Sequence, residues 1–334
     1  MQQLVEGLLA IAGGVFGILA LFYVANFLVE RLPTTWEHRV KPWIFIAPSI
    51  AVVTVFLVGP GILTIRDSFY GPRGETYVGW ENYVSNILRG DGFLGLNPDF
   101  VTLISNNLIW IVAVPTICIV TGLATSALAD RLRPRWESIA KSTIFLPLAI
   151  SFVGAATIWN FVYAFRAGSL EQVGLLNAVV TSLGFGPTAW LTVSTLKLNT
   201  ILLTIVMGWM YAGFAMVLLS AAIKSVPEET LEAARIDGAS ELQIFRKVTL
   251  PQIRSTVFVV ATTITVLVMK IFDIVFVMTS GRHGTDIVAH RFYTEAFQTR
   301  QQGDAAVFVV VLIVAVIPLM YANIQQFKEQ EATR

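Results

Sequence analysis

The stretch SVPEETLEAARIDGAS at residues 225–240, with VTLP at residues 248–251 after it, decides how this chain is interpreted. It is a polar segment between two long apolar runs. Ser225, followed three residues later by Glu228, has the spacing of a capping box, which predicts the start of a helix. Gly238 has the conformational freedom that ends a helix in a tight turn. We therefore expect a short helix that begins after residue 225 and ends at this glycine.

A second short helix is expected directly after the glycine. Ser240 and Gln243 again have the spacing of a capping box, and Pro251 marks where a new segment begins. The two helices form a hairpin that is too polar to enter lipid and too small to fold alone. Such a hairpin is best explained as a surface presented to a soluble partner.

The hairpin resembles the EAA loop of binding-protein-dependent ABC importer permeases. The residues assigned to this loop are Glu232, Ala233, Ala234, Asp237, Gly238, Leu250 and Pro251. In that family the loop is the coupling helix that docks in a groove of the ATPase subunit, so the resemblance implies the same role here. An ordinary cytoplasmic linker, the alternative interpretation, does not account for the full spacing between two membrane spans.

The composition independently places the chain in a membrane. Hydrophobic residues make up 55% of it and charged residues only 13%, and the mean hydropathy is +0.70. A soluble globular domain carries about 25% charged residues. The net charge of +1 gives no argument for nucleic acid as a partner. The single cysteine, Cys118, lies in an apolar run and cannot form a disulfide within the chain.

Apolar stretches long enough to cross a bilayer, about 20 residues each, can be counted along the chain. The expected fold is an all-α polytopic membrane protein, with a six-helix importer-permease core and one extra N-terminal transmembrane helix. The seven expected spans are Gly7 to Val29, Trp43 to Ile65, Val101 to Ala129, Ser142 to Phe165, Leu198 to Ile223, Ser255 to Met278 and Ala305 to Phe327.

The division into domains and the topology follow from these spans. Residues 1–42 are expected to form the extra helix and a cytoplasmic linker, and residues 43–334 the permease domain, with the EAA-like loop at 224–254. If that loop is cytoplasmic, the inside segments carry most of the 23 Lys and Arg residues, in agreement with the positive-inside rule. The chain is thus expected in the cytoplasmic (inner) membrane of a bacterium or archaeon, with the N-terminus outside and the C-terminus in the cytoplasm.

Two further regions suggest the type of permease. The phrase from Val78 to Tyr83, and the outer loop from Gly174 to Leu191, resemble external loops of sugar-type permeases. The segment from Lys270 to Gly281 resembles the maltose type, and most closely its alpha-glucoside branch. In the loop that follows this segment, Arg282-His283-Gly284 stands where the broad family has Gly-Gly-Pro, which also favours the alpha-glucoside branch. The resemblance implies a neutral disaccharide or related α-glucoside, such as trehalose, sucrose or maltose.

Candidate residues for a sugar path are few. Lys270 and Asp273 are the only charges inside an expected span, and an intramembrane charge is a functional-site hypothesis. Alternatively, Lys270 snorkels outward or pairs with Asp273 at i+3. Phe272 can stack on a pyranose or simply fill the bundle. The remaining candidates, which offer amide groups and flat apolar faces and are otherwise packing residues, are Asn199, Trp209 and Tyr211.

Signatures of enzymes are missing from the sequence. No Gly-x4-Gly-Lys-Ser/Thr phosphate loop occurs, so we expect no enzymatic activity on this chain and expect ATP and Mg to be bound by a partner ATPase. The other expected partners are a second EAA-bearing permease, an ATPase dimer, an extracytoplasmic sugar-binding protein and membrane lipid, and no nucleic acid. Two alternatives remain: an ion-coupled secondary transporter, and an ABC importer permease for a solute other than a sugar.

Overall fold

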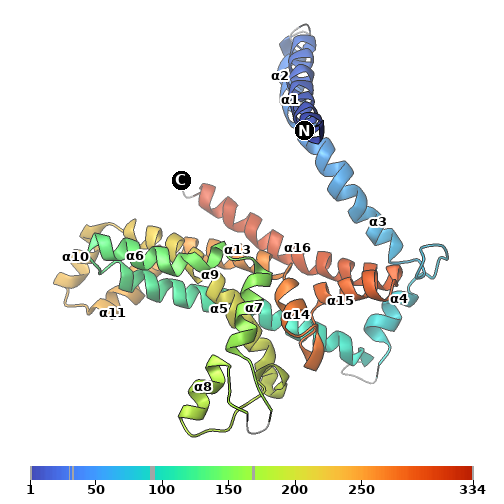
Figure 1. The fold of residues 1–334 in the computed structure, drawn as a ribbon. Coiled ribbons are helices and arrows are strands. Elements are labelled where there is room, and N and C mark those ends of the chain that lie inside the picture. The colour runs from blue at the N-terminus through green and yellow to red at the C-terminus, as the bar shows by residue number, and fades with distance from the viewer. Residues whose placement is uncertain (1, 30, 32–33, 91–94, 168–169, 333–334) are drawn as a thin grey trace. The chain divides into compact units, whose positions relative to one another are not determined.

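In a computed structural model of the chain, the residues that the structure describes are 2–29, 31, 34–90, 95–167 and 170–332 (Figure 1). These residues are mainly helical, and the only extended pairing among them is an isolated bridge between Tyr70 and Tyr77. The chain divides into two compact units, Met1–Arg66 and Asp67–Arg334.

The described residues of the first unit are almost all helical. Its elements are α1 (Gln2–Val29), α2 (Thr34–Val53), a π-helical turn η1 (Thr54–Val58) and α3 (Gly59–Asp67). The continuous helical stretch Lys41–Asp67 is long and apolar enough to cross a membrane, and none of its most apolar part is buried. This unit contains the first two of the expected spans.

The second unit is organised around two long helices, α5 (Pro98–Ala129) and α9 (Leu198–Lys224), which pack closely along their length. Asn97 caps α5 by accepting a hydrogen bond from the backbone N–H of Asp99 at 2.9 Å. The helices approach so closely that a Cβ at Gly122 would lie 2.9 Å from the Cβ of Ala215. This packing creates the main hydrophobic core of the unit.

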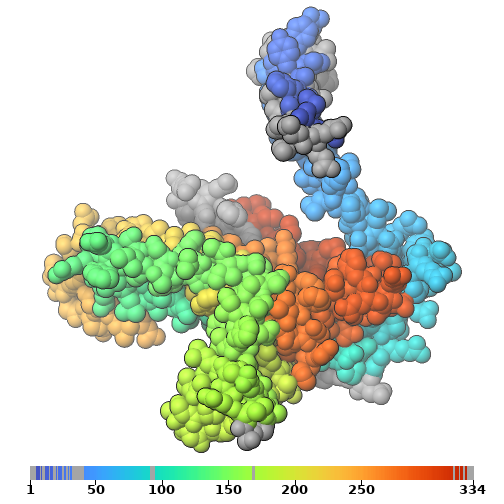
Figure 2. Space-filling model, viewed as in Figure 1, coloured from blue at the N-terminus to red at the C-terminus, as the bar shows by residue number. Residues whose placement is uncertain are grey.

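The remaining elements surround this pair. They are α4 (Glu81–Tyr83), η2 (Val84–Leu88), α6 (Pro134–Phe145), η4 (Leu146–Ala149), α7 (Phe152–Val162), α8 (Leu175–Ser182), η5 (Trp190–Thr192), η6 (Thr195–Lys197), α10 (Glu228–Ile236), α11 (Glu241–Ile244), η7 (Phe245–Thr249), α12 (Leu250–Gln252), α13 (Arg254–Val268), α14 (Asp273–Met278), η8 (Arg282–Gly284), α15 (Val288–Tyr293), η9 (Thr294–Gln298) and α16 (Gln302–Ala332). Within this unit, the segment formed by α7 and α8 projects to one side of the helical body (Figure 2).

Two of the expected spans are not continuous helices. The stretch expected at 142–165 breaks after α6, and the joined α6 and η4 meet α7 at an angle of 103°. Pro147 contributes to this break because it lacks a backbone N–H. The stretch expected at 255–278 is interrupted between α13 and α14.

The number of helices that can cross a membrane follows from their length and composition. Four helices in the described part of the chain are long and apolar enough to cross a membrane. The number is up to six if each of two bent pairs is one span: Pro134–Ala149 with Phe152–Val162, and Glu241–Gln252 with Arg254–Val268. The predicted helical membrane protein is confirmed, but the count of seven spans is not.

Candidate functional site

The polar segment of the sequence forms a helical hairpin, which we call the polar hairpin and define as α10 and α11 (residues 228–244). Gly238 joins the two helices with φ = +80°, in the left-handed region where glycine is favoured. At the start of α11 the predicted capping box is present: the backbone N–H of Ser240 donates to Oε1 of Gln243 at 2.8 Å. This half of the hairpin was predicted correctly.

The capping box predicted at the start of α10 is wrong. The N-cap of α10 is Pro227, and no side chain caps that helix. The hydroxyl of Ser225 instead donates to the carbonyl oxygen of Ala222, 2.7 Å away in the last turn of α9. Because Ser225 is still engaged with the preceding helix, its hydroxyl is not directed to the turn that it was predicted to cap.

The polar hairpin is an exposed surface, as the sequence indicated. No residue of α10 is buried, and Glu232, Ala233 and Asp237 are exposed. Two large apolar side chains are also exposed, Ile236 on α10 (86%) and Leu242 on α11 (65%). The hairpin therefore presents exposed acidic and apolar side chains together.

Two kinds of contact hold the hairpin in place. Nε of Arg235 on α10 lies 3.0 Å from Oε1 of Glu241 on α11, and this carboxylate raises the pKa of the arginine. At the base, Leu231 and Leu250 pack on a small apolar cluster that includes Ile253. The polar hairpin is therefore attached to the helical body through a few apolar side chains.

A network of charges lies where α5 and α9 approach the hairpin. Nζ of Lys141 on α6 lies 2.6 Å from Oδ1 of Asp130 and 2.7 Å from Oε1 of Glu137. The same ammonium contacts the hydroxyl of Ser220 on α9, and Lys224 in the last turn of α9 pairs with Glu137 at 2.5 Å. The network joins three helices next to the hairpin. Only the i,i+4 spacing of Glu137 and Lys141 was a sequence signal for it.

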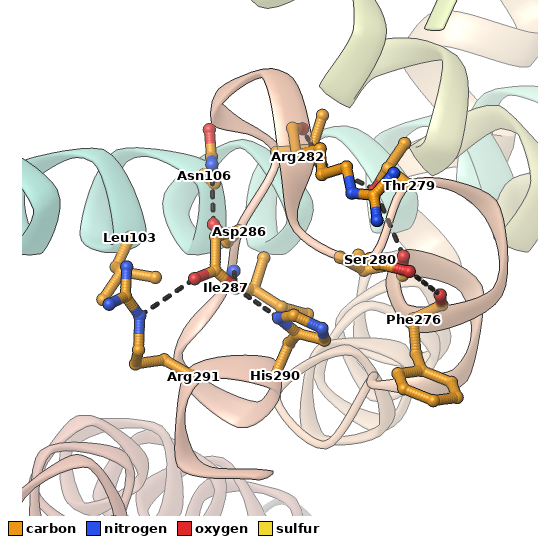
Figure 3. A network of polar contacts seen from close by, with 12 residues as sticks. Leu103, Asn106, Phe276, Thr279, Ser280, Arg282, Asp286, Ile287, His290 and Arg291 are labelled. Atoms are coloured by element: carbon orange, nitrogen blue, oxygen red, sulfur yellow. Dashed lines mark hydrogen bonds and ion pairs between the residues drawn. The ribbon is translucent and has the colours of Figure 1, made fainter. Parts of the chain in front are cut away.

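At the opposite end of the second unit, two buried asparagines hold the loop between α14 and α15, and Figure 3 shows one of them, Asn106. The side-chain amide of Asn106 on α5 donates to the carbonyl oxygens of Gly284 and Asp286, at 2.8 and 2.7 Å. The amide of Asn199 on α9 donates to the carbonyl oxygen of His283 at 2.9 Å. The predicted path residue Asn199 thus uses its amide to hold the backbone of a loop.

The same loop is tied to α15 by a carboxylate (Figure 3). Oδ1 of Asp286 lies 2.6 Å from Nδ1 of His290, and Oδ2 accepts a hydrogen bond from Nε of Arg291 at 3.0 Å. His290 is buried and stacks on Phe272 with ring centroids 6.0 Å apart. The loop is therefore tied by hydrogen bonds to α5, α9 and α15, and it contacts the predicted path residue Asn199 directly.

The other aromatic candidates contact the broken span. Trp209 on α9 meets Trp159 on α7 edge-on with ring centroids 5.8 Å apart, and Tyr211 stacks on Phe152 at 6.2 Å. Both Trp209 and Tyr211 are partly exposed. These faces lie along the surface of α9 that α7 covers.

Phe272 and its charged neighbours lie at the second break. The ring of Phe272 contacts those of Phe276 and Tyr293, with centroids 5.0 and 4.9 Å away. Lys270 is exposed in the interruption between α13 and α14, and Asp273 begins α14. Both residues lie in the described part of the chain, and no ion pair joins them there. The predicted i,i+3 pairing is therefore not formed, because the helix is interrupted between them.

The helices that follow the two breaks pack against each other, since α14 contacts α7. The structure thus brings Trp209, Tyr211 and Phe272 to a region where two spans are interrupted. The sequence did not predict these breaks.

The sequence profile of the family described as binding-protein-dependent transport system inner membrane component matches residues 108–331. The chain belongs to this family. It is a permease component of such a transport system, and the alternative of a secondary transporter is excluded.

Individual relatives agree with this assignment. The chain is 45% identical to the osmoprotective compounds uptake permease protein GgtC of Synechocystis, over 87% of this chain and 100% of the relative. It is 40% identical to the alpha-glucoside transport system permease protein AglF of Rhizobium meliloti, over 97% of each chain. Among solved structures, a chain of a bacterial ABC transporter that imports alginate has the same fold, with a TM-score of 0.70 at 19% identity over 89% of this chain and 99% of that chain.

Proposed function

We propose that this chain is the membrane-spanning subunit of an ATP-driven importer for neutral α-glucosides of about disaccharide size. The observation that carries the proposal is the sequence relationship to AglF, an alpha-glucoside permease, across nearly the whole of both chains. GgtC, which takes up osmoprotective compounds, is related to a similar degree. A neutral α-glucoside such as trehalose or sucrose is compatible with both names.

The region around the two breaks is suited to such a ligand. Interrupted helices free backbone polar groups at membrane depth, and these are tolerated where they line a cavity or are covered by protein. Trp209, Tyr211 and Phe272 supply flat apolar faces there. A sugar without charge needs hydroxyl partners and apolar faces, and it requires no buried counter-ion. Lys270 and Asp273 remain candidates for the path, and Asn199 acts on it through the loop that it holds.

We assign the polar hairpin to coupling. Two permease subunits form the pathway, and closure of two ATPase subunits on ATP and Mg moves the hairpins that dock on them. Glu232, Ala233, Ala234, Asp237 and Gly238 supply the docking helix and its turn, and Leu250 and Pro251 connect it to α13. In this arrangement the extracytoplasmic binding protein delivers the sugar on the side of the loop at residues 279–287, and the hairpin faces the cytoplasm.

The experiment is uptake by the complete transporter in vesicles, with a panel of α-glucosides, amino acids, polyamines and phosphate esters. We expect only neutral α-glucosides to stimulate ATP hydrolysis and to accumulate. Stimulation by a charged solute and by none of the α-glucosides would refute the substrate assignment and leave the family assignment in place.

Two substitutions test whether the sugar path passes the aromatic side chains of the site. Tyr211→Ala and Phe272→Ala remove a stacking face, and we expect each to raise the half-saturating sugar concentration. The matched control is Val217→Ala, on the exposed side of the same helix as Tyr211. If the control and the two variants have equal half-saturating concentrations, the path does not pass these residues.

A further inference from the structure

Three arginines lie close together in the sequence where the connection from α5 enters α6. Arg131, Arg133 and Arg135 occupy alternate positions in the connection and at the start of α6, and all three are exposed. None of them has an ion-pair partner within the part of the chain that the structure describes. Trp136, which follows directly, is 61% exposed. Exposed arginines beside an exposed tryptophan are the composition of a membrane interface.

An apolar groove of about 560 Å³ begins at the first of these arginines. It runs between α5 and the second half of the hairpin region, and its apolar lining includes Val120, Ala124, Leu242 and Phe245. Its charged lining residues are Arg131 and Glu241. From Val120 to Ala129, the last residue of α5, the helix rises about 14 Å at 1.5 Å per residue, and Arg131 follows two residues later. The groove therefore extends from an arginine well into the apolar part of a membrane-spanning helix.

The charges of the groove favour an anion. Glu241 is already paired with Arg235, whereas Arg131 has no partner in the described part of the chain. The groove also continues an exposed apolar face of α5, since Leu108, Val112 and Val120 are 56%, 64% and 60% exposed. A spanning helix with such a face contacts lipid or another subunit, and free arginines at its end select for negative headgroups.

We propose that this groove binds an anionic phospholipid of the leaflet on the hairpin side. The phosphate lies at Arg131, with Arg133 and Arg135 adding to the attraction, and one acyl chain lies in the groove between α5 and the α11–η7 segment. The bound lipid then fills the space between a spanning helix and the base of the polar hairpin. The proposal is independent of which solute the transporter carries.

The test is native mass spectrometry of the complete purified transporter with phosphatidylglycerol or phosphatidylcholine added at matched concentrations. We expect wild type to retain phosphatidylglycerol selectively. Arg131→Gln should weaken retention about fivefold and the triple Arg131→Gln, Arg133→Gln, Arg135→Gln variant on the order of a hundredfold, because each arginine near a lipid surface adds a similar increment. Arg89→Gln, an exposed arginine at the opposite end, is the charge control and should have no effect.

A second pair of variants tests the groove itself. Ala124→Trp fills the groove and should abolish selective retention, whereas Val112→Trp, higher on the same exposed face, should not. If inorganic phosphate competes as well as the lipid does, or if Ala124→Trp retains lipid as wild type does, the acyl site is refuted. Equal retention of the two lipids refutes the proposal. If the triple variant loses the ATPase subunit but retains lipid as wild type does, the arginines contact the ATPase subunit. That result also refutes the lipid proposal.

Discussion

Gly238 allows the coupling role of the polar hairpin to be tested through a single backbone angle. Its φ of +80° is one that other L-residues adopt only at a cost. A Cβ built at this position meets no atom within 4 Å. Substitution there therefore adds no clash with neighbouring residues, and the whole effect comes from the conformation of the turn.

The size of the effect follows from this geometry. A residue with a Cβ in the left-handed region costs roughly 1–2 kcal/mol, asparagine costs less, and a β-branched residue costs more. The turn opposes this with two backbone hydrogen bonds, Gly238 N–H to Arg235 O at 3.0 Å and Ala239 N–H to Ala234 O at 3.1 Å. The ion pair between Arg235 and Glu241 is exposed to solvent and therefore adds little to this. A cost of roughly 1–2 kcal/mol then lowers the equilibrium ratio of formed to unformed hairpin about 5–30-fold.

The assay compares Gly238→Asn, Gly238→Ala and Gly238→Val in the reconstituted transporter, with substrate-stimulated ATP hydrolysis and uptake measured together. We expect both activities to be reduced least by asparagine, more by alanine and most by valine. All three variants should insert normally into the membrane. Glu232→Lys, which inverts an exposed charge on α10 without changing the turn, should also reduce both. If the valine variant and Glu232→Lys both transport at the native rate with native ATPase stimulation, the hairpin is not the coupling element.

The other predictions concern topology and the interior. In a Cys118→Ser background, a cysteine at Trp80 should react with an impermeant thiol reagent in intact cells and one at Ser240 only after permeabilisation; labelling at Ser240 in intact cells would invert the topology. Lys141→Met removes the cation shared by the carboxylates of Asp130 and Glu137, so we expect a lower melting temperature and weaker coupling of ATP hydrolysis to uptake; native values of both would show that the charge network has no mechanical role. Asn177→Leu removes four part-buried hydrogen bonds of the α8 segment, and it should destabilise the protein by about 3 kcal/mol or more, measured as thermal unfolding of the purified complex; an unchanged unfolding temperature would contradict this.

Features that depend on local chemistry could be predicted from the sequence. The turn at Gly238 and the capping box at Ser240 involve residues at most a few positions apart, so residue type and spacing were sufficient to find them. The capping box predicted at Ser225 is wrong because the hydroxyl of Ser225 donates a hydrogen bond to the last turn of the preceding helix instead. Local rules decide such cases only when no competing partner is within reach.

Membrane character and the family were also determined by the sequence, because hydropathy and a spaced motif can be recognised without knowing how the helices pack. The tertiary structure alone decided where the spans break and which polar groups meet. Asn106 contacts Gly284 across 178 positions, and Ser220 contacts Asp130 across 90. Asn199, a plausible sugar ligand by residue type, is instead buried with its amide bonded to a loop carbonyl. The physical reason is that a buried amide must form hydrogen bonds, and it does so with the carbonyl groups that the fold places beside it. How α5 and α9 pack determines which carbonyl groups these are.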